Sequence, residues 1–355
     1  MFLKSLQLTH FRNYSNLELH FDNRPTIFLG DNAAGKSNIL EAVYLLSTTK
    51  SLRAQNEDEL IKETEEFAKI EGFIIFGEAE SELLIILNRI TDVLNFKKKV
   101  LVNGIPRKAV DFMGNLPAVI FYPLDINMVT GSPSLRRWHI DLCLAQVDPQ
   151  YKKAITVYEH FLTSRNKVLK RIREGKGRVD ELDYWTQEVI EKGEEISKKR
   201  KEFFVFINSL EKPLGDFMFE YLPSEISLEK LNLIQSREIA SAQTLIGPHR
   251  DDFSLILSGR KMANFGSRGE QRTATLAFKL SQLEYMAKIL GKRPMLLLDD
   301  VFSELDASHR AHIVEIVSKQ QTLIATVELE NIPKEFLASA RILKVEEGKI
   351  IDNKI

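Results

Sequence analysis

The segment GDNAAGKS, residues 30–37, decides the fold of this chain. Its two glycines, lysine and serine have the spacing G-x-x-x-x-G-K-[ST] of a phosphate-binding loop. The strand-like run PTIFLG (25–30) precedes it, and apolar residues at helical spacing follow it over 36–46. Glycines let the backbone curl so that successive N–H groups point at phosphate oxygens, and the dipole of the following helix favours the same negative charge. The segment therefore predicts an α/β nucleotide-binding core.

The side chains of this loop indicate a nucleoside triphosphate as the ligand. We expect Lys36 to place its charge between the β- and γ-phosphates and the Ser37 hydroxyl to bind Mg²⁺. ATP or GTP, together with Mg²⁺, is thus the predicted ligand. The loop residues expected to line this nucleotide site are Gly30, Asp31, Asn32, Ala33, Ala34, Gly35, Lys36, Ser37 and Asn38.

A second segment, PMLLLDDVFSELD (294–306), contributes two carboxylates. Its apolar run is typical of a strand buried on both faces, and the carboxyl end of such a strand is where α/β sheets bind ligands. We expect Asp299 to hold Mg²⁺ through water and Asp300 to polarise the attacking water. The predicted catalytic residues are Lys36, Asp299 and Asp300, and the predicted metal ligands are Ser37 and Asp299.

A third segment, SRGEQRTATLAFKLSQLE (267–284), opens a long helix with a serine and a glycine. Such a start makes a second anion-binding helix N-terminus, although the chain already has one phosphate loop. The economical interpretation is a head-to-tail homodimer in which Ser267 reaches the γ-phosphate held by the other subunit. An ordinary capped helix is the alternative interpretation.

Strand and helix patterns alternate along the rest of the chain. Apolar residues at period two over 67–102 predict a β-meander, closed by a tight turn at Asn103-Gly104. Apolar residues recur at steps of three, four or seven over 151–172 and 182–221, with glycines between the two runs. These runs predict one antiparallel helical hairpin.

The order of these patterns gives the expected domain organisation. Strand-like patterns resume at residue 252, and the last of them is a hairpin over 341–352. We therefore expect an α/β fold with a mixed sheet and flanking helices, split by a helical insertion. The predicted bounds are residues 1–118 and 243–355 for a discontinuous lobe I and residues 119–242 for a helical lobe II.

Composition excludes several classes of protein. The chain of 355 residues has 49 basic and 50 acidic residues, so a uniformly basic nucleic-acid coat is excluded while a local basic patch is not. Hydrophobic residues make up 44%, which is typical of a globular protein. No uninterrupted apolar run approaches the roughly 20 residues of a membrane span. The single cysteine, Cys143, forms no intrachain disulfide. We expect a cytoplasmic protein without a membrane partner.

Basic residues concentrate in the first arm of the expected hairpin, over 152–178. A basic helix face makes salt-sensitive, sequence-independent contacts with phosphates, so this arm is a candidate DNA surface. A solvated charged face is the alternative interpretation. Arg136 and Arg137 either bind DNA or bridge the two lobes. The predicted DNA-binding residues are Lys152, Lys153, Lys167, Lys170, Arg171 and Arg173.

The order of the phosphate loop, the S-x-G-x-Q turn, LLLDD and SELD (303–306) resembles the ABC-type ATPase heads of the SMC and RecF superfamily. One short hairpin stands where the SMC proteins insert long coiled coils, which favours the RecF family within it. Further runs that resemble RecF sequence are FRNY (11–14), SNILEAVYLLSTTKSLR (37–53), GSPSLRRWHID (131–141), GPHRDD (247–252) and SRGEQRT (267–273).

The resemblance implies an ATP-dependent, DNA-binding dimer that acts at gaps and double-strand/single-strand junctions. With RecR and RecO, such a protein helps to place RecA recombinase on single-stranded DNA. By position, Asp306 matches a residue that lines the dimer contact, and Arg53 matches an arginine near the nucleotide. The signature turn of the family corresponds here to Ser267, Gly269 and Gln271.

This sequence departs from the pattern of related ATPases. Thr326 stands where many ABC ATPases have a switch histidine, and Asp300 replaces the usual glutamate. The segment YPLD (122–125) is the expected position of the γ-phosphate-sensing loop. These departures predict slow hydrolysis. A transporter-type ABC ATPase, a P-loop kinase of a small metabolite and a DNA-binding scaffold with structural ATP are the competing hypotheses.

Overall fold

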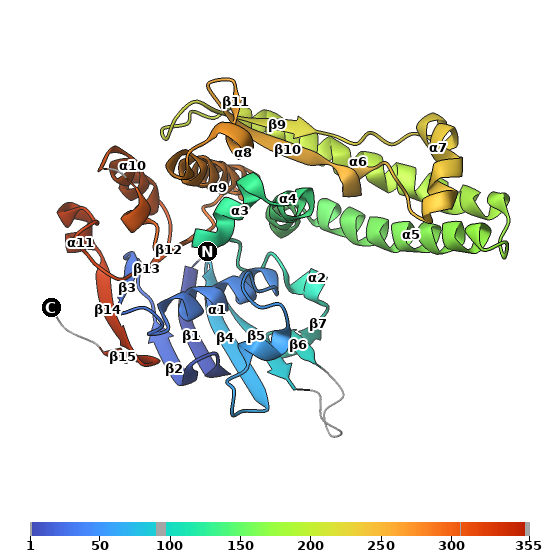
Figure 1. The fold of residues 1–355 in the computed structure, drawn as a ribbon. Helices are drawn as coiled ribbons and strands as arrows, with labels where there is room; N and C mark the ends of the chain where they lie inside the picture. The colour runs from blue at the N-terminus through green and yellow to red at the C-terminus, as the bar shows by residue number, and fades with distance from the viewer. Residues whose placement is uncertain (1, 90–96, 306, 352–355) are drawn as a thin grey trace. The chain divides into compact units, whose positions relative to one another are not determined.

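The computed structural model describes residues 2–89, 97–305 and 307–351. The chain divides into two compact units: unit 1 holds residues 1–125 and 279–355, and unit 2 holds residues 126–278. These bounds differ from the expected lobes, which place residues 243–278 with the nucleotide-binding core. The difference arises because the strand at 252–257 pairs with the strand at 217–222 and not with the sheets of unit 1. Figure 1 shows the elements of both units.

Unit 1 contains an antiparallel sheet built by the first half of its chain. The expected meander is confirmed, because β4, β5 and β6 pair antiparallel in sequence order. Asn103 and Gly104 form the tight turn to β7, both with positive φ. The sheet order is β2 (Tyr14–His20), β1 (Phe2–Phe11), β4 (Phe67–Phe76), β5 (Ala79–Asn88), β6 (Lys98–Val102) and β7 (Ile105–Arg107).

A second sheet of unit 1 joins strands from both ends of the chain. Its strands are mutually parallel except for β15, which forms the expected C-terminal hairpin with β14. The carboxyl ends of β3, β13 and β12 therefore meet at one edge, where α/β sheets bind ligands. The order is β15 (Lys349–Ile351), β14 (Arg341–Glu346), β3 (Thr26–Leu29), β13 (Thr322–Thr326), β12 (Met295–Asp299) and β8 (Ala118–Phe121).

Helix α1 (Lys36–Thr48) lies between the two sheets and contacts strands of both. It is buried on nearly every side, which explains why the run ILEAVYLL is apolar around its circumference. This packing fixes the N-terminus of α1 at the edge of the parallel sheet. The other helices assigned to unit 1 are η1 (Glu57–Leu60), α2 (Ala109–Phe112), η2 (Pro123–Ile126), η5 (Phe302–Glu304), α10 (Ala307–Val317) and α11 (Lys334–Ser339).

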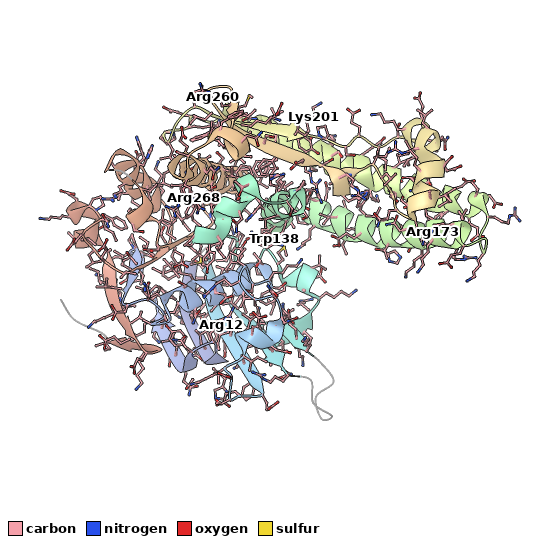
Figure 2. The ribbon with its side chains drawn as sticks, viewed as in Figure 1. Arg12, Trp138, Arg173, Lys201, Arg260 and Arg268 are labelled. Carbon is pink, nitrogen blue, oxygen red and sulfur yellow. The ribbon has the colours of Figure 1, made fainter. Side chains whose placement is uncertain are left out.

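Unit 2 is built on the antiparallel hairpin of α5 (Pro149–Arg173) and α6 (Asp183–Ser209), which confirms the predicted hairpin. Arg173 lies near its turn and Lys201 farther along α6 (Figure 2). The prediction of one helix through residue 221 is wrong, because the chain leaves the helix after Ser209 and forms strand β9 (Phe217–Leu222). Pro213 lacks a backbone N–H and Gly215 has φ 131°, and both features disfavour a continued helix.

A three-stranded sheet packs on this hairpin, in the order β11 (Arg260–Lys261), β10 (Asp252–Leu257) and β9. The turn between β10 and β11 lies at Ser258-Gly259, and the short β11 leads into α8 (Met262–Phe265). Helix α9 (Arg268–Leu290) contains the boundary between the units. The remaining helices of unit 2 are α3 (Asn127–Thr130), α4 (Pro133–Val147), η3 (Val179–Leu182), α7 (Leu228–Ser241) and η4 (Pro248–Arg250).

Candidate functional site

The phosphate loop connects β3 to α1, and its two glycines are sterically required. A Cβ atom on Gly30 would lie 2.2 Å from the carbonyl oxygen of Val345. Gly35 has φ +118°, and a Cβ there would lie 2.6 Å from Nδ2 of Asn13. That same Nδ2 donates to the Ala34 carbonyl at 3.0 Å. The β1–β2 turn and the β14–β15 hairpin therefore support the loop and fix its curl.

Lys36 folds back over the loop, as a phosphate-binding lysine must. Its Nζ donates to the carbonyl oxygens of Gly30 at 2.7 Å and Asp31 at 2.8 Å, and the side chain is buried. Burial lowers the pKa of Lys36, and the nearby carboxylates of Asp299 and Asp300 oppose that shift. The ammonium thus lies at the sheet edge, among groups that favour its charge.

Ser37 and Asp299 are far apart in the sequence but in contact in the fold. The Ser37 hydroxyl donates to Oδ1 of Asp299 at 2.9 Å, although the two residues are 262 positions apart. Burial raises the pKa of Asp299 to about 6, against hydrogen bonding by Ser37 and the charges of Arg53 and Lys36. A desolvated carboxylate beside a hydroxyl is a pair of oxygen donors of the kind that Mg²⁺ prefers. The two predicted metal ligands are therefore adjacent and fit such a cation.

Of the remaining residues predicted to act in hydrolysis, Asp300 follows β12 and Thr326 is the last residue of β13. Asp300 is half-buried, has φ 52°, and donates its N–H to the Ala325 carbonyl at 2.9 Å. Thr326 is buried, and its carbonyl accepts from the Gly30 N–H at 3.4 Å. The Thr326 hydroxyl donates to the Glu328 carbonyl at 2.9 Å. Thr326 thus lies beside the phosphate loop with its hydroxyl already engaged.

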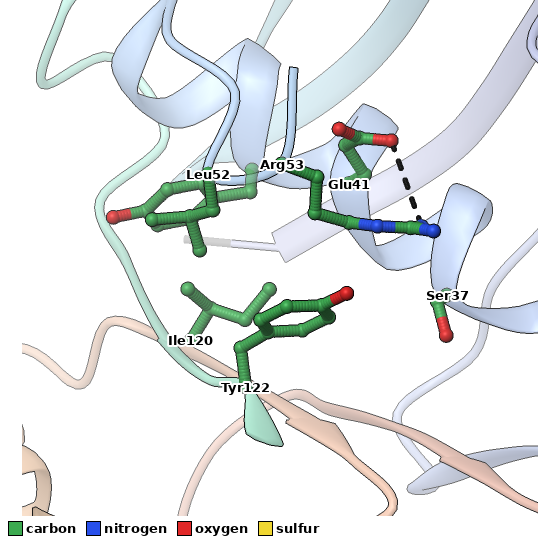
Figure 3. A pocket seen from close by; sticks show the side chains of 7 residues that line it. Ser37, Glu41, Leu52, Arg53, Ile120 and Tyr122 are labelled. Carbon is green, nitrogen blue, oxygen red and sulfur yellow. Dashed lines mark ion pairs between the residues drawn. The ribbon is translucent and has the colours of Figure 1, made fainter. Parts of the chain in front are cut away.

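Arg53 lies beside the same helix N-terminus. Its Nη1 donates to Oδ1 of Asn38 at 2.9 Å and lies 3.9 Å from Oε2 of Glu41. Its guanidinium stands 5.8 Å from the centre of the Tyr122 ring. Figure 3 shows Arg53 between Glu41 and Tyr122, reaching toward Ser37. The structure therefore brings Asn38 and Arg53 together at this edge, and their contact with a nucleotide stays a prediction.

Two residues near the site, Asn13 and Glu41, received no role from the sequence, and Tyr122 was predicted only as part of the YPLD segment. Asn13 belongs to FRNY, which supported the resemblance but received no role. Glu41 is the acidic residue in an otherwise apolar stretch of α1, one turn after Ser37, and this was the available signal. Tyr122 opens the YPLD segment, whose Asp125 is buried and paired with Lys279 at 3.2 Å. The γ-phosphate-sensing role of that segment remains a prediction.

The signature residues lie at the start of α9, in unit 2. Ser267 and Gly269 are exposed, and a Cβ on Gly269 would meet no atom within 4 Å. The Glu270 N–H donates to the Ser267 hydroxyl at 3.3 Å and the Ser267 N–H donates to Oε2 of Glu270 at 2.7 Å, a capping box at the start of the helix. Gln271 Nε2 donates to the Met262 carbonyl at 3.0 Å. Asp306, the residue matched to the dimer contact, lies outside the described residues.

The basic arm is confirmed as helix α5, but its available charge is smaller than the sequence count. Arg165 is fully buried and pairs with Glu238 at 2.7 Å, so it is part of the core. Arg171 pairs with Glu181 at 2.9 Å while remaining about half exposed. Of the six predicted DNA-binding residues, Lys152 is half-buried and the exposed ones are Lys153, Lys167, Lys170, Arg171 and Arg173.

The charged residues of α4 and of the GPHRDD segment form internal ion pairs. Arg136 Nε lies 2.6 Å from Oδ1 of Asp252, and Arg137 donates to the Asp251 carbonyl at 2.7 Å. Asp251 pairs with the buried Arg200 at 2.8 Å. These contacts join the two expected lobes, yet all lie within unit 2. They favour the structural interpretation over DNA binding for this cluster.

Comparisons with known proteins agree with this geometry. The family model of the RecF/RecN/SMC N-terminal domain matches residues 2–349. The DNA replication and repair protein RecF of Bacillus cytotoxicus is 34% identical and covers 99% of this chain and 98% of its own length. In the part of the chain that the structure describes, none of the helices has the length and apolar character of a bilayer span.

Solved structures extend the likeness to three dimensions. The recombination mediator protein RecF with ATP, from the RecFOR pathway, has a TM-score of 0.86 at 29% identity and covers 98% of this chain and 96% of that chain. An SMC head bound to the C-winged helix domain of ScpA has a TM-score of 0.52 at 15% identity and covers 99% of this chain and 98% of that chain. At this identity the likeness shows the fold alone. On these grounds the protein belongs to the RecF family of DNA replication and repair proteins, within the RecF/RecN/SMC group of ATPase heads.

Proposed function

We propose that this protein is an ATP-dependent DNA-binding protein of recombinational repair. ATP joins two copies head to tail into a clamp on double-stranded DNA near gaps and double-strand/single-strand junctions. The observation that carries the proposal is the 2.9 Å hydrogen bond from Ser37 to Asp299, because it unites the phosphate loop and the carboxylate strand at one sheet edge. Membership of the RecF family supports the role in repair.

Ser37 and Asp299 are the residues that would hold Mg²⁺. Bound there, the cation would offset the negative charge of the β- and γ-phosphates. The loop N–H groups and the N-terminus of α1 bind the phosphate oxygens. The Lys36 ammonium, which donates to the carbonyl oxygens of Gly30 and Asp31 in this structure, contributes a positive charge. Together these groups bind the triphosphate tightly. The attacking water is oriented by two short side chains, those of Asp300 and Thr326.

Hydrolysis in this site is slow and resets the clamp. Asp300 is one methylene shorter than the usual glutamate, so it holds an attacking water less closely. The Thr326 hydroxyl already donates to the Glu328 carbonyl at 2.9 Å, which leaves it less available to orient that water. We expect a DNA-dependent turnover far below tens per second. A slow cycle suits a clamp because the ATP-bound dimer must outlast the loading of its partners.

Exposed basic residues of α5 supply the DNA contacts of the clamp. Their contacts with phosphates are independent of base sequence, so the surface recognises duplex and not a motif. In the cytoplasm, RecR with RecO then recognises the DNA-bound dimer and promotes the loading of RecA on single-stranded DNA. ATP acts by population shift, because it stabilises the dimer over the monomer.

The test measures the assembly state and duplex binding in one sample. Sedimentation is followed together with the anisotropy of a fluorescent duplex, with and without ATP and Mg²⁺, and the control is Lys36→Met. We expect ATP to convert monomer to dimer and to tighten duplex binding, both only in the wild type. A monomer whose duplex affinity ignores ATP contradicts the clamp. Phosphorylation of a metabolite by that monomer would identify a kinase.

A further inference from the structure

Glu41 is a buried carboxylate that lies one helical turn below Ser37 on α1. Arg12 donates to both of its oxygens, from Nε at 2.9 Å and from Nη2 at 2.8 Å. The remaining terminal nitrogen of Arg12, Nη1, donates to the Glu59 carbonyl at 2.8 Å. A bidentate pair of this kind is rigid, so Glu41 is a fixed point beside the phosphate site. Arg12 itself is committed to this structural pair.

Ser51 connects that fixed point to the segment after α1. Its hydroxyl donates to Oε1 of Glu41 at 2.5 Å. It also accepts from the backbone N–H of Arg53 at 3.0 Å and of Ala54 at 2.9 Å. A serine hydroxyl has one proton and two lone pairs, so all of its hydrogen-bonding capacity is used here. One hydroxyl therefore fixes the backbone of residues 51–54 to α1.

Arg53 projects from this fixed backbone toward the phosphate loop. Its side chain is 34% exposed, and the Asn38 amide that accepts from it also donates to Asn13 at 2.8 Å. Asn13 in turn donates to the Ala34 carbonyl of the loop. Arg53 lines one side of a small pocket whose other walls include Leu52, Ile120 and Tyr122 (Figure 3).

We propose that Ser51, anchored on Glu41, is a positioning residue that holds the Arg53 guanidinium beside the triphosphate. This inference rests on the proposed ATP site and names a residue that acts on it through Arg53. The Arg53 side chain is partly exposed and reaches Asn38 from residues 51–54, so its position depends in part on where that backbone is fixed. Loss of the Ser51 hydroxyl releases two backbone N–H groups together with the link to Glu41.

The test is a double-mutant cycle on ATP affinity, measured with a fluorescent ATP analogue and Mg²⁺. We expect Ser51→Ala to weaken binding about tenfold and Ser51→Thr, which keeps the hydroxyl, to restore it. Arg53→Ala weakens binding at least as much, and the double variant Ser51→Ala/Arg53→Ala binds no more weakly than Arg53→Ala alone. Non-additivity of this kind shows that two residues act through one contact.

Melting temperatures separate positioning from folding. Ser318→Ala is the matched control, because that exposed serine donates only to a helix carbonyl, Glu315, at 2.9 Å. We expect Ser51→Ala to melt within a few degrees of this control. Unchanged ATP affinity in Ser51→Ala, or losses that add in the double variant, would overturn the inference. A wild type that binds no ATP would instead refute the proposed function.

Discussion

The burial of Asp299 leads to a prediction about stability and pH. Its pKa in the fold is about 6, raised by desolvation from the ordinary 3.8. Between these two values the folded chain keeps a proton that the unfolded chain releases, so stability falls as the pH rises through this window. Above pH 6 the ionised Asp299 carboxylate lowers the free energy of unfolding by roughly 3 kcal/mol. This follows from about 1.4 kcal/mol for each pH unit between the two pKa values.

Asp299→Asn removes this cost while it keeps an oxygen that accepts from Ser37. We expect the nucleotide-free variant to be more stable than the wild type by up to about 3 kcal/mol at pH 7.5, with the difference nearly gone at pH 4. Urea unfolding across that range measures it. Glu315→Gln, which removes an exposed carboxylate, is the control and changes stability by less than about 0.5 kcal/mol.

Two results would refute the reasoning. One is an Asp299→Asn variant that is no more stable than the wild type at pH 7.5. The other is a gain in stability that does not change between pH 4 and pH 7.5. Added Mg²⁺ and ATP give a separate test of the metal proposal, because they should stabilise the wild type and leave Asp299→Asn nearly unchanged.

Three further predictions concern the dimer, the core and the DNA surface. Ser267→Arg should leave ATP binding intact and prevent the ATP-dependent dimer in sedimentation, so normal dimers in this variant would contradict the head-to-tail arrangement. Arg165→Leu leaves Glu238 buried without its cation and should cost about 3–5 kcal/mol in urea unfolding; a loss under about 1 kcal/mol would contradict the pairing. Lys167→Glu/Lys170→Glu should weaken ATP-dependent duplex binding and lower its salt slope by about 2, whereas the exposed control Lys201→Glu on α6 should not.

Local patterns predicted most of the elements, because their causes are local. The meander, the Asn103-Gly104 turn and α1 each follow from a periodicity or a turn preference within a few residues. The strand over 217–222 was missed because its apolar residues continue the spacing of α6. What forms it is pairing with β10, about 30 positions later in the sequence, which a periodicity does not reveal.

The site was predictable in its residue types and less so in their partners. Arg165 and Lys167 have the same charge in the sequence, yet one is buried with Glu238 and the other is exposed. A count of charges overestimates the DNA surface for this reason. Glu41 shows the converse, since a lone acid in an apolar helix is a strong signal only when its partner, the half-buried Arg12, is known.

The two roles of α1 explain why this helix is buried so completely. Its N-terminus presents the phosphate-binding N–H groups, and one turn later Glu41 fixes Arg12 and Ser51. Any shift of the helix would therefore move the phosphate site and the anchor of Arg53 together. Two sheets that clamp α1 on opposite sides prevent such a shift. The rigidity of the ATP site is thus a consequence of packing in unit 1, and it extends through Glu41 and Ser51 to the backbone of Arg53.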